Sequence, residues 1–157
     1  MGRLDDARLS VDAFRVPASI ASSQEGRTMN TRQLNAWSPK MLSILRIVSG
    51  LIFLEHGTQK LLGFPPGKLA NIPINNMGAY AGLVEFACGA LIALGLFTRP
   101  AAFLASGTMA VAYWTAHAPQ NAFPVNNGGD AAILYCFVFL YLVFAGPGAW
   151  SVDGRRR

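Results

Sequence analysis

Charged residues are scarce in this sequence. Only 13% of its 157 residues are Asp, Glu, Lys or Arg, whereas a typical soluble domain carries about 25%. The shortfall lies after Met41, where long apolar segments dominate, and 52% of the whole chain is hydrophobic. These proportions argue against an ordinary soluble domain. They indicate a small integral membrane protein with room for one helical bundle.

Cysteine pairs and metal-ligand motifs are also lacking. The two cysteines, Cys88 and Cys136, both lie inside apolar runs and form no CxxC pair. No ligand spacing typical of a metal site occurs, and no haem, flavin or iron–sulfur motif is present. We therefore predict buried structural thiols, no metal site, and no thiol-exchange chemistry based on a cysteine pair of the chain's own.

The positive net charge does not indicate a nucleic-acid partner. Residues 1–28 carry four basic and four acidic groups, so this segment contributes nothing to the net charge of +5. The excess comes from Lys and Arg near the ends of apolar segments and from the tail at 155–157. Such flanks orient membrane helices and contact anionic head groups. The predicted partner is the lipid bilayer.

Residues 1–36 contain no long apolar stretch, and therefore no hydrophobic region of a secretory signal. Their polar and small residues predict a disordered N-terminal leader. We place a four-helix membrane domain at 37–150 and a basic C-terminal tail at 151–157. An alternative for the leader is that translation starts at Met29.

Four apolar segments follow the leader, at about 41–62, 77–97, 101–118 and 130–145. The loop at 63–76 contains three prolines and cannot continue a helix. The loop at 119–129 is rich in Asn and Gly, and a Gly-Pro-Gly sequence ends the last segment. The predicted fold is an all-α, four-helix transmembrane bundle.

The distribution of basic residues predicts the orientation of this bundle. Arg32 and Lys40 precede the first segment, Arg99 lies between the second and third, and the arginine tail follows the fourth. Four crossings put all of them on one side, whereas the opposite loops contain only Lys68. Lys and Arg concentrate on the cytoplasmic side of membrane proteins. We therefore expect both termini in the cytoplasm.

Glu85 lies in the middle of the second apolar segment. A carboxylate at that depth costs roughly 2.5–3.5 kcal/mol on insertion scales, so it is a functional-site candidate by default. Residue counting places His56 at a similar depth, about 10 Å below the outer end of the first segment. We predict that Glu85 faces His56 across a stripe of small residues. The pair acts either as a structural clamp or in binding a substrate or cofactor.

Other ionisable residues approach the same half of the bundle. Arg46 shares a helical sector with His56 and either faces the bundle or snorkels to the head groups. Glu55 points away from that sector, and Lys60 is expected to snorkel outward. His117 and Asp130 lie at outer helix ends, where structural roles are the alternatives. The candidate intramembrane polar site comprises Arg46, His56, Lys60, Glu85, His117 and Asp130.

Four sequence signals occur in order within about residues 40–153. They are His56-Gly57-x-x-Lys60-Leu61, Glu85 followed by Gly89, Asn127-Gly128-Gly129-Asp130, and Gly146-Pro147-Gly148. In this combination the chain resembles the DoxX family. The family is named for its likeness to DoxD, the membrane subunit of an archaeal thiosulfate:quinone oxidoreductase. The resemblance implies a multi-pass protein of the bacterial inner membrane. It also implies that His56, Lys60, Glu85 and Asp130 are motif positions without an assigned chemistry.

Two functions are compatible with these residues. The first is a redox-associated component that binds quinone or supports a membrane oxidoreductase, with a membrane or periplasmic redox partner. The alternative is a non-catalytic membrane scaffold or assembly factor. A small transporter is weaker, because no inverted repeat or broken helix is evident. The sequence does not decide whether the chain is an enzyme, and quinone is the candidate cofactor.

Overall fold

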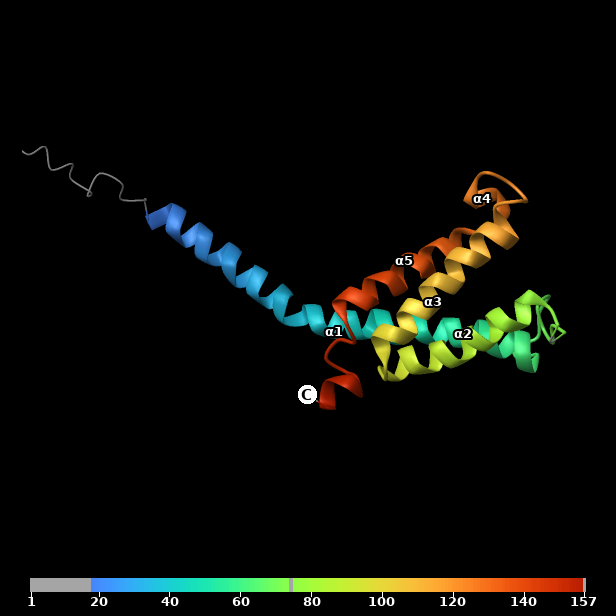
Figure 1. The fold of residues 1–157 in the computed structure, drawn as a ribbon. Coiled ribbons are helices and arrows are strands. Elements are labelled where there is room, and N and C mark those ends of the chain that lie inside the picture. The colour runs from blue at the N-terminus through green and yellow to red at the C-terminus, as the bar shows by residue number, and fades with distance from the viewer. Residues whose placement is uncertain (1–17, 74, 157) are drawn as a thin grey trace, which may run out of the picture. The chain divides into compact units, whose positions relative to one another are not determined.

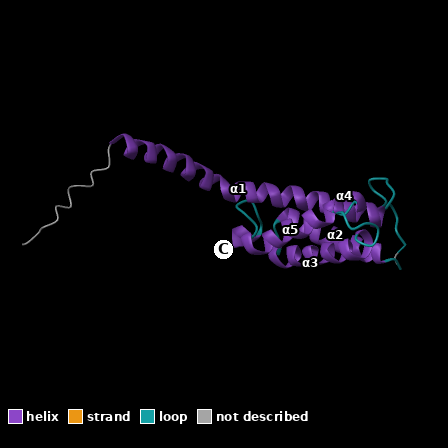
Figure 2. Cartoon of the chain, turned by 90° about the horizontal axis from the view of Figure 1, so that it is seen from above, coloured by secondary structure: helices purple, strands orange, loops and turns teal. Residues whose placement is uncertain are grey.

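The protein is all-helical in the part of the chain described by the computed structural model, residues 18–73 and 75–156 (Figures 1 and 2). The helices are α1 (Ala18–Leu62), α2 (Met77–Leu94), α3 (Thr98–Ala112), α4 (Pro124–Asn127) and α5 (Asp130–Ala145). A π-helical turn, Tyr113–His117, continues α3, and a 3-10 turn covers Asp153–Arg156. The predicted all-α class is confirmed for these residues, which contain no strand.

Helix α1 is longer than predicted. It begins at Ala18, so the part of the predicted leader from residue 18 to 36 is helical, and Pro39 lies inside the helix. Residues 1–17 of that leader lie outside the described part. The prediction failed because a lack of apolar residues excludes burial but does not exclude a helix, and no proline occurs between Ala18 and Pro39. The chain divides into two compact units, Met1–Trp37 and Ser38–Arg157, and the second unit contains the apolar segments.

Glycines bring α1 and α2 into close contact. A Cβ atom at Gly57 would lie 2.4 Å from the backbone nitrogen of Phe86, and one at Gly89 would lie 2.6 Å from that of Leu54. Both distances are too short for any side chain larger than hydrogen. Small residues let membrane helices approach to backbone contact. The small residues of the second segment therefore lie against α1 at Gly89.

Helix α3 packs against α5 on one side and against α2 on the other. The core includes the rings of Phe53 and Phe139, whose centroids lie 4.7 Å apart in an edge-on arrangement. Ile92, Ala102 and Leu142 are fully buried around them. Toward α4 the pair α3–α5 diverges from the pair α1–α2 (Figure 1). This divergence leaves room for a groove between α2 and α3.

The predicted basic tail is part of the folded domain, which corrects the boundary at residue 150. Ser151 is buried, and the Asp153 carboxylate accepts hydrogen bonds from the backbone N–H groups of Phe97 and Thr98, at 3.0 and 2.9 Å. Phe97 supplies no side-chain cap of its own, so Asp153 satisfies the first exposed donors of α3. The sequence analysis assigned Asp153 to a basic tail because three arginines follow it closely, and so missed this capping role.

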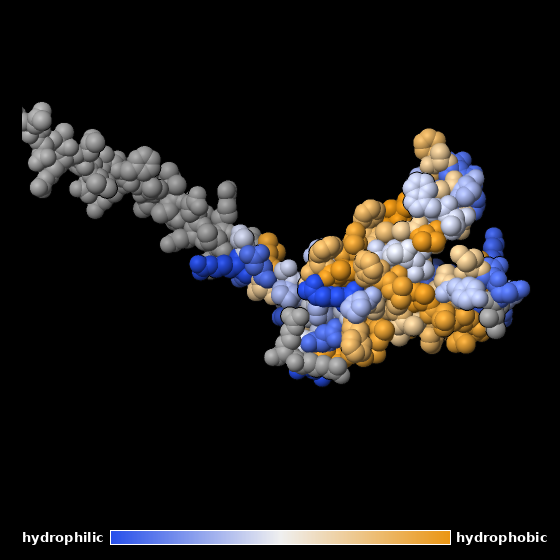
Figure 3. Space-filling model, viewed as in Figure 1, coloured by the Kyte–Doolittle hydropathy of each residue, from blue (hydrophilic) through white to orange (hydrophobic). Residues whose placement is uncertain are grey.

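Large apolar side chains cover the outside of the second unit (Figure 3). Leu51, Leu83, Phe103, Leu134 and Phe144 are among the exposed ones. A surface with so many apolar side chains suits lipid and not water. Two helical stretches among the described residues are long and apolar enough to cross a membrane, Thr31–Leu62 and Met77–Leu94, and α5 is a shorter apolar helix.

Candidate functional site

A buried ion pair joins α1 to α2. The ammonium nitrogen Nζ of Lys60 lies 2.5 Å from the carboxylate oxygen Oε1 of Glu85, and the two side chains are 13% and 3% exposed. Gly82 makes room for the lysine, because a Cβ atom there would lie 2.9 Å from Lys60 Cβ. The expectation that Lys60 snorkels outward was therefore wrong. At this short distance the attraction between the two charges offsets part of the cost of removing them from water.

The second oxygen of Glu85, Oε2, has no hydrogen-bond partner. Among the described residues it is the only buried side-chain nitrogen or oxygen in this state. Leaving a buried acceptor unsatisfied costs about 1–3 kcal/mol, more for a charged group. An exception of this kind needs a physical reason, such as a proton or a donor that arrives during function. Among the described residues, Glu85 is therefore the strongest candidate for a functional side chain.

The predicted pairing of Glu85 with His56 was wrong. His56 is exposed, and its ring packs edge-on against Tyr135 of α5 with a centroid distance of 6.2 Å. His56 and Lys60 are one turn apart on α1 and differ by only about 40° in direction. Residue counting matched the depth of His56 to that of Glu85, but the longer side chain of Lys60 reaches the carboxylate from the next turn of α1.

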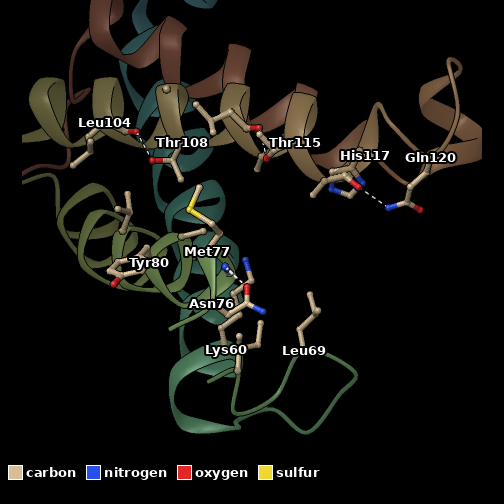
Figure 4. A pocket seen from close by; sticks show the side chains of 18 of the residues that line it. Lys60, Leu69, Asn76, Met77, Tyr80, Leu104, Thr108, Thr115, His117 and Gln120 are labelled. Atoms are coloured by element: carbon tan, nitrogen blue, oxygen red, sulfur yellow. Dashed lines mark hydrogen bonds between the residues drawn. The ribbon is translucent and has the colours of Figure 1, made fainter. Parts of the chain in front are cut away.

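An apolar groove of about 970 Å³ opens between α2 and α3 beside this ion pair. Its walls include Tyr80 and Val84 from α2 and Phe103 and Val111 from α3, and Lys60 reaches its lining from α1. Figure 4 shows Lys60 and Tyr80 on the side opposite the residues of α3. Such a volume lies within the usual range of small-molecule sites.

The groove is polar toward the end near α4. Asn76, Thr115, His117 and Gln120 line it there, with the last three following one another along the end of α3 and the turn beyond it (Figure 4). Polar groups at one end and apolar walls along the rest match a molecule with a polar head and an apolar tail.

Gly107 lines the groove at a position with free space in front of it. A Cβ atom built at this position of α3 would meet nothing within 4 Å. Glycine lowers helix stability by up to about 1 kcal/mol relative to alanine, so its use in the middle of α3 has a cost. The side chains of Thr108 and Thr115 also line the groove, and their hydroxyls donate to carbonyls one turn earlier in the helix.

Only some of the predicted site residues come together. His117 lines the same groove as Lys60, and its Nδ1 lies 3.0 Å from the backbone oxygen of Asn127. Asp130 is exposed in the first turn of α5 and lines neither this groove nor the cavity beside His56. That smaller cavity, about 160 Å³, is lined by Ile52, Glu55, His56, Gln59 and Pro65.

Arg46 belongs to a separate structural network. It is fully buried and donates to the carbonyl oxygens of Ile92 and Ala93 at 2.5 and 2.6 Å. It also donates to Pro147 O at 2.7 Å and to Trp150 O. A cation suits the carbonyl end of a helix. Of its two predicted alternatives, Arg46 therefore takes the one that faces the bundle. Its hydrogen bonds join α2 and the C-terminal segment to α1.

The sequence did not single out Tyr135 or Gly107. Tyr135 sits in the apolar run of α5, where an aromatic residue is normally part of the core. Gly107 is one of 16 glycines, and nothing in the sequence distinguishes it from those at helix contacts. The positions of both residues beside a cavity or ring can be recognised only in the folded chain.

The DoxX family model matches residues 41–118, which contain both members of the ion pair and most of the groove. The chain belongs to the DoxX family. An uncharacterised protein of Haemophilus influenzae is 42% identical over 127 residues, which cover 78% of this chain and 95% of that protein. No solved structure is significantly similar to the chain.

Two further relatives are named as membrane proteins. The inner membrane protein YphA of Escherichia coli is 33% identical over 143 residues, covering 82% of this chain and 99% of YphA. An uncharacterised membrane protein of Mycobacterium tuberculosis is 32% identical over 151 residues, covering 79% of this chain and 86% of that protein. Together with the apolar helices, these similarities show that this DoxX protein is an integral membrane protein.

Proposed function

We propose that this DoxX protein is a four-span inner-membrane protein that binds a quinone in the α2–α3 groove and serves a membrane redox complex. The observation that carries the proposal is the position of the Lys60–Glu85 ion pair beside an apolar groove of about 970 Å³. A hydrophobic pocket with a few well-placed polar groups is the usual form of a cofactor site.

The proposed topology has both termini in the cytoplasm. Helices α1, α2 and α5, with α3 extended by its π-helical turn, supply the four spans. Asp153 binds the start of α3 and the backbone N–H of Ala149 donates to Pro39 O, so the loop before α3, the C-terminal segment and Pro39 share one end. Arg99 and the arginine tail follow in sequence at that end, which supports a cytoplasmic location. The name of the relative YphA supports the inner membrane.

A quinone matches the chemistry of the groove. Its carbonyl oxygens accept hydrogen bonds, and an ammonium group has three donors, of which Lys60 uses one for Glu85. The aromatic and aliphatic walls suit its ring and isoprenoid tail, and the surrounding surface is lipid-like. In this proposal the protein holds and orients the quinone head, and electrons pass to or from a redox partner. A scaffold needs only a packed bundle, so it predicts no bound quinone.

The test is to fill the groove from Gly107. The Gly107→Phe side chain points into open space, so this variant is expected to fold and to exclude the ligand. Gly107→Ala is the matched control, because one methyl group leaves most of the volume free. Each protein is purified in mild detergent, extracted with organic solvent, and analysed for quinone per chain by mass spectrometry.

We expect the wild type and Gly107→Ala to contain quinone above the level of empty micelles. We expect Gly107→Phe to contain only a small fraction of the wild-type amount. Equal thermal stability of the three proteins verifies that the loss is local. Quinone at the micelle level in the wild type, or equal amounts in all three proteins, would contradict the proposal and favour the scaffold.

A further inference from the structure

The polar end of the groove has hydrogen-bond donors on one wall. Lys60 of α1 donates one N–H to Glu85, and its other N–H groups have no partner in the described part of the chain. The side chain of Asn76 accepts from the backbone N–H of Gly78 through Oδ1, at 2.8 Å, so its amide nitrogen is left to donate. Both Lys60 and Asn76 line the groove. A ligand head at this end therefore meets donors from the side of α1 and α2.

The opposite wall presents acceptors. His117 lines the groove, and its Nδ1 lies 3.0 Å from the backbone oxygen of Asn127. A carbonyl oxygen only accepts, so Nδ1 carries the ring hydrogen, and Nε2 of the neutral ring is an acceptor. Among the described residues Nε2 has no hydrogen-bond partner. The Nε2 of Gln120 donates to Ala116 O at 2.5 Å, so the amide oxygen of Gln120 is a second acceptor on this wall.

A buried asparagine fixes the direction of the His117 ring. The side chain of Asn127 donates from Nδ2 to Asn121 O at 2.8 Å and accepts through Oδ1 from the N–H of Gly129 at 2.7 Å. The backbone oxygen of Asn127 is therefore held in place, and its bond to His117 Nδ1 sets the tautomer of the imidazole. The two ring nitrogens point away from each other, so Nε2 is left for a ligand.

We propose that the groove selects the reduced form of the quinone, hydroquinone, and holds its head between these two walls (Figure 4). A hydroquinone hydroxyl both donates and accepts, so it satisfies His117 Nε2 as well as the donors of Lys60 and Asn76. The carbonyl oxygen of an oxidised quinone only accepts, and it leaves His117 Nε2 unpaired. The choice of hydroquinone rests on the proposed function, since it names the redox form of the same ligand.

The head of this ligand lies at the end of the groove where α3 finishes. Helix α3 begins at Thr98, which Asp153 binds, and its π-helical turn ends at His117. In the proposed topology the start of α3 is cytoplasmic, so His117 lies on the periplasmic side. The apolar walls at Phe103 and Leu104 then take the tail toward the middle of the membrane.

The test compares the two redox forms of one probe, a benzoquinone with a decyl tail. The whole chain, purified in mild detergent and freed of native quinone, is titrated anaerobically with the quinone and with the hydroquinone kept reduced by dithionite. Titration calorimetry gives both dissociation constants, with empty micelles as the blank. The pH is about 8, where imidazole is ordinarily neutral. We expect hydroquinone to bind about tenfold more tightly, the usual effect of one additional hydrogen bond.

His117→Phe is the informative variant, because it keeps a ring and removes the acceptor. We expect it to bind hydroquinone about tenfold more weakly than the wild type, and oxidised quinone within about threefold of the wild type. His56→Phe is the matched control, because it makes the same substitution at a histidine that does not line the groove. It is expected to keep the wild-type ratio. Circular dichroism verifies that both variants fold.

Equal affinities of the wild type for the two forms, or tighter binding of the oxidised form, would overturn the assignment of hydroquinone. An unchanged ratio in His117→Phe would do the same. The wild-type comparison needs no variant, so it decides the question even if His117→Phe does not fold. Binding of neither form would contradict the proposed function as well, whereas equal binding of both forms would leave that function standing.

Discussion

Replacing Lys60 with methionine is expected to destabilise the protein by about 3–5 kcal/mol. The change leaves the Glu85 carboxylate buried without the ammonium group that lies 2.5 Å away in the wild type. Removing one partner of a buried ion pair commonly costs this much, because the remaining charge stays in a low-dielectric site. The free energy of unfolding is measured by chemical denaturation in detergent.

The double variant Lys60→Met/Glu85→Gln tests whether the two residues act as a pair. Glu85→Gln alone leaves the ammonium group without its carboxylate, but the double variant has no charge at either position. We therefore expect it to cost clearly less than the sum of the two single changes. Coupling between membrane side chains averages about 0.6 kcal/mol, and an ion pair at this distance is expected to exceed that value.

His56→Gln provides the comparison for this cycle. His56 was the predicted partner of Glu85 but is exposed and does not contact it in the structure. Its combination with Glu85→Gln is expected to be additive within roughly 0.5 kcal/mol. Additivity of the lysine cycle together with strong coupling in the histidine cycle would reverse the assignment of the partner.

Gly57→Ala is expected to destabilise the protein by about 1–3 kcal/mol, the usual cost of adding a methyl group to a filled contact. The new Cβ would lie 2.4 Å from the backbone nitrogen of Phe86, and backbone atoms cannot move aside as a flexible side chain can. Thermal denaturation in detergent measures the effect. The same substitution at Gly89, 2.6 Å from Leu54 N, is expected to act in the same direction.

Gly107→Ala is the control for this prediction. It adds the same methyl group to another helix, where the new Cβ would meet nothing within 4 Å beyond its own turns of helix. Alanine favours a helix over glycine by up to about 1 kcal/mol, so this variant is expected to be neutral or slightly more stable. Equal destabilisation at Gly57 and Gly107 would mean that the close contact of α1 and α2 is not what makes glycine necessary.

Helix positions in the membrane domain were largely predictable from the sequence. The ends of α1 at Leu62 and of α5 at Ala145 follow from prolines and glycines just beyond them. The predicted end of α2 at Phe97 was three residues late, because Gly95 takes the left-handed conformation and stops the helix after Leu94. The sequence shows where the glycines are, but it does not show which of them takes the left-handed conformation that ends a helix.

The site was predictable only in part. Glu85 could be identified because a carboxylate in an apolar run is costly wherever it points. Its partner depended on a rotation of about 40° and on the extra reach of a lysine side chain, which residue counting does not resolve. The groove depends on how α3 and α5 diverge from α1 and α2, and that angle is a property of the whole bundle.

The most direct test of quinone binding is photolabelling with a light-activated quinone analogue, followed by mass spectrometry of the labelled peptides. If quinone binds in the groove, adducts are expected on residues that line it, such as Tyr80 and Val84 of α2 and Phe103, Leu104 and Val111 of α3. Excess natural quinone and the Gly107→Phe variant should both suppress them. Adducts confined to the exposed apolar residues of α5, such as Leu134 and Phe137, would contradict it.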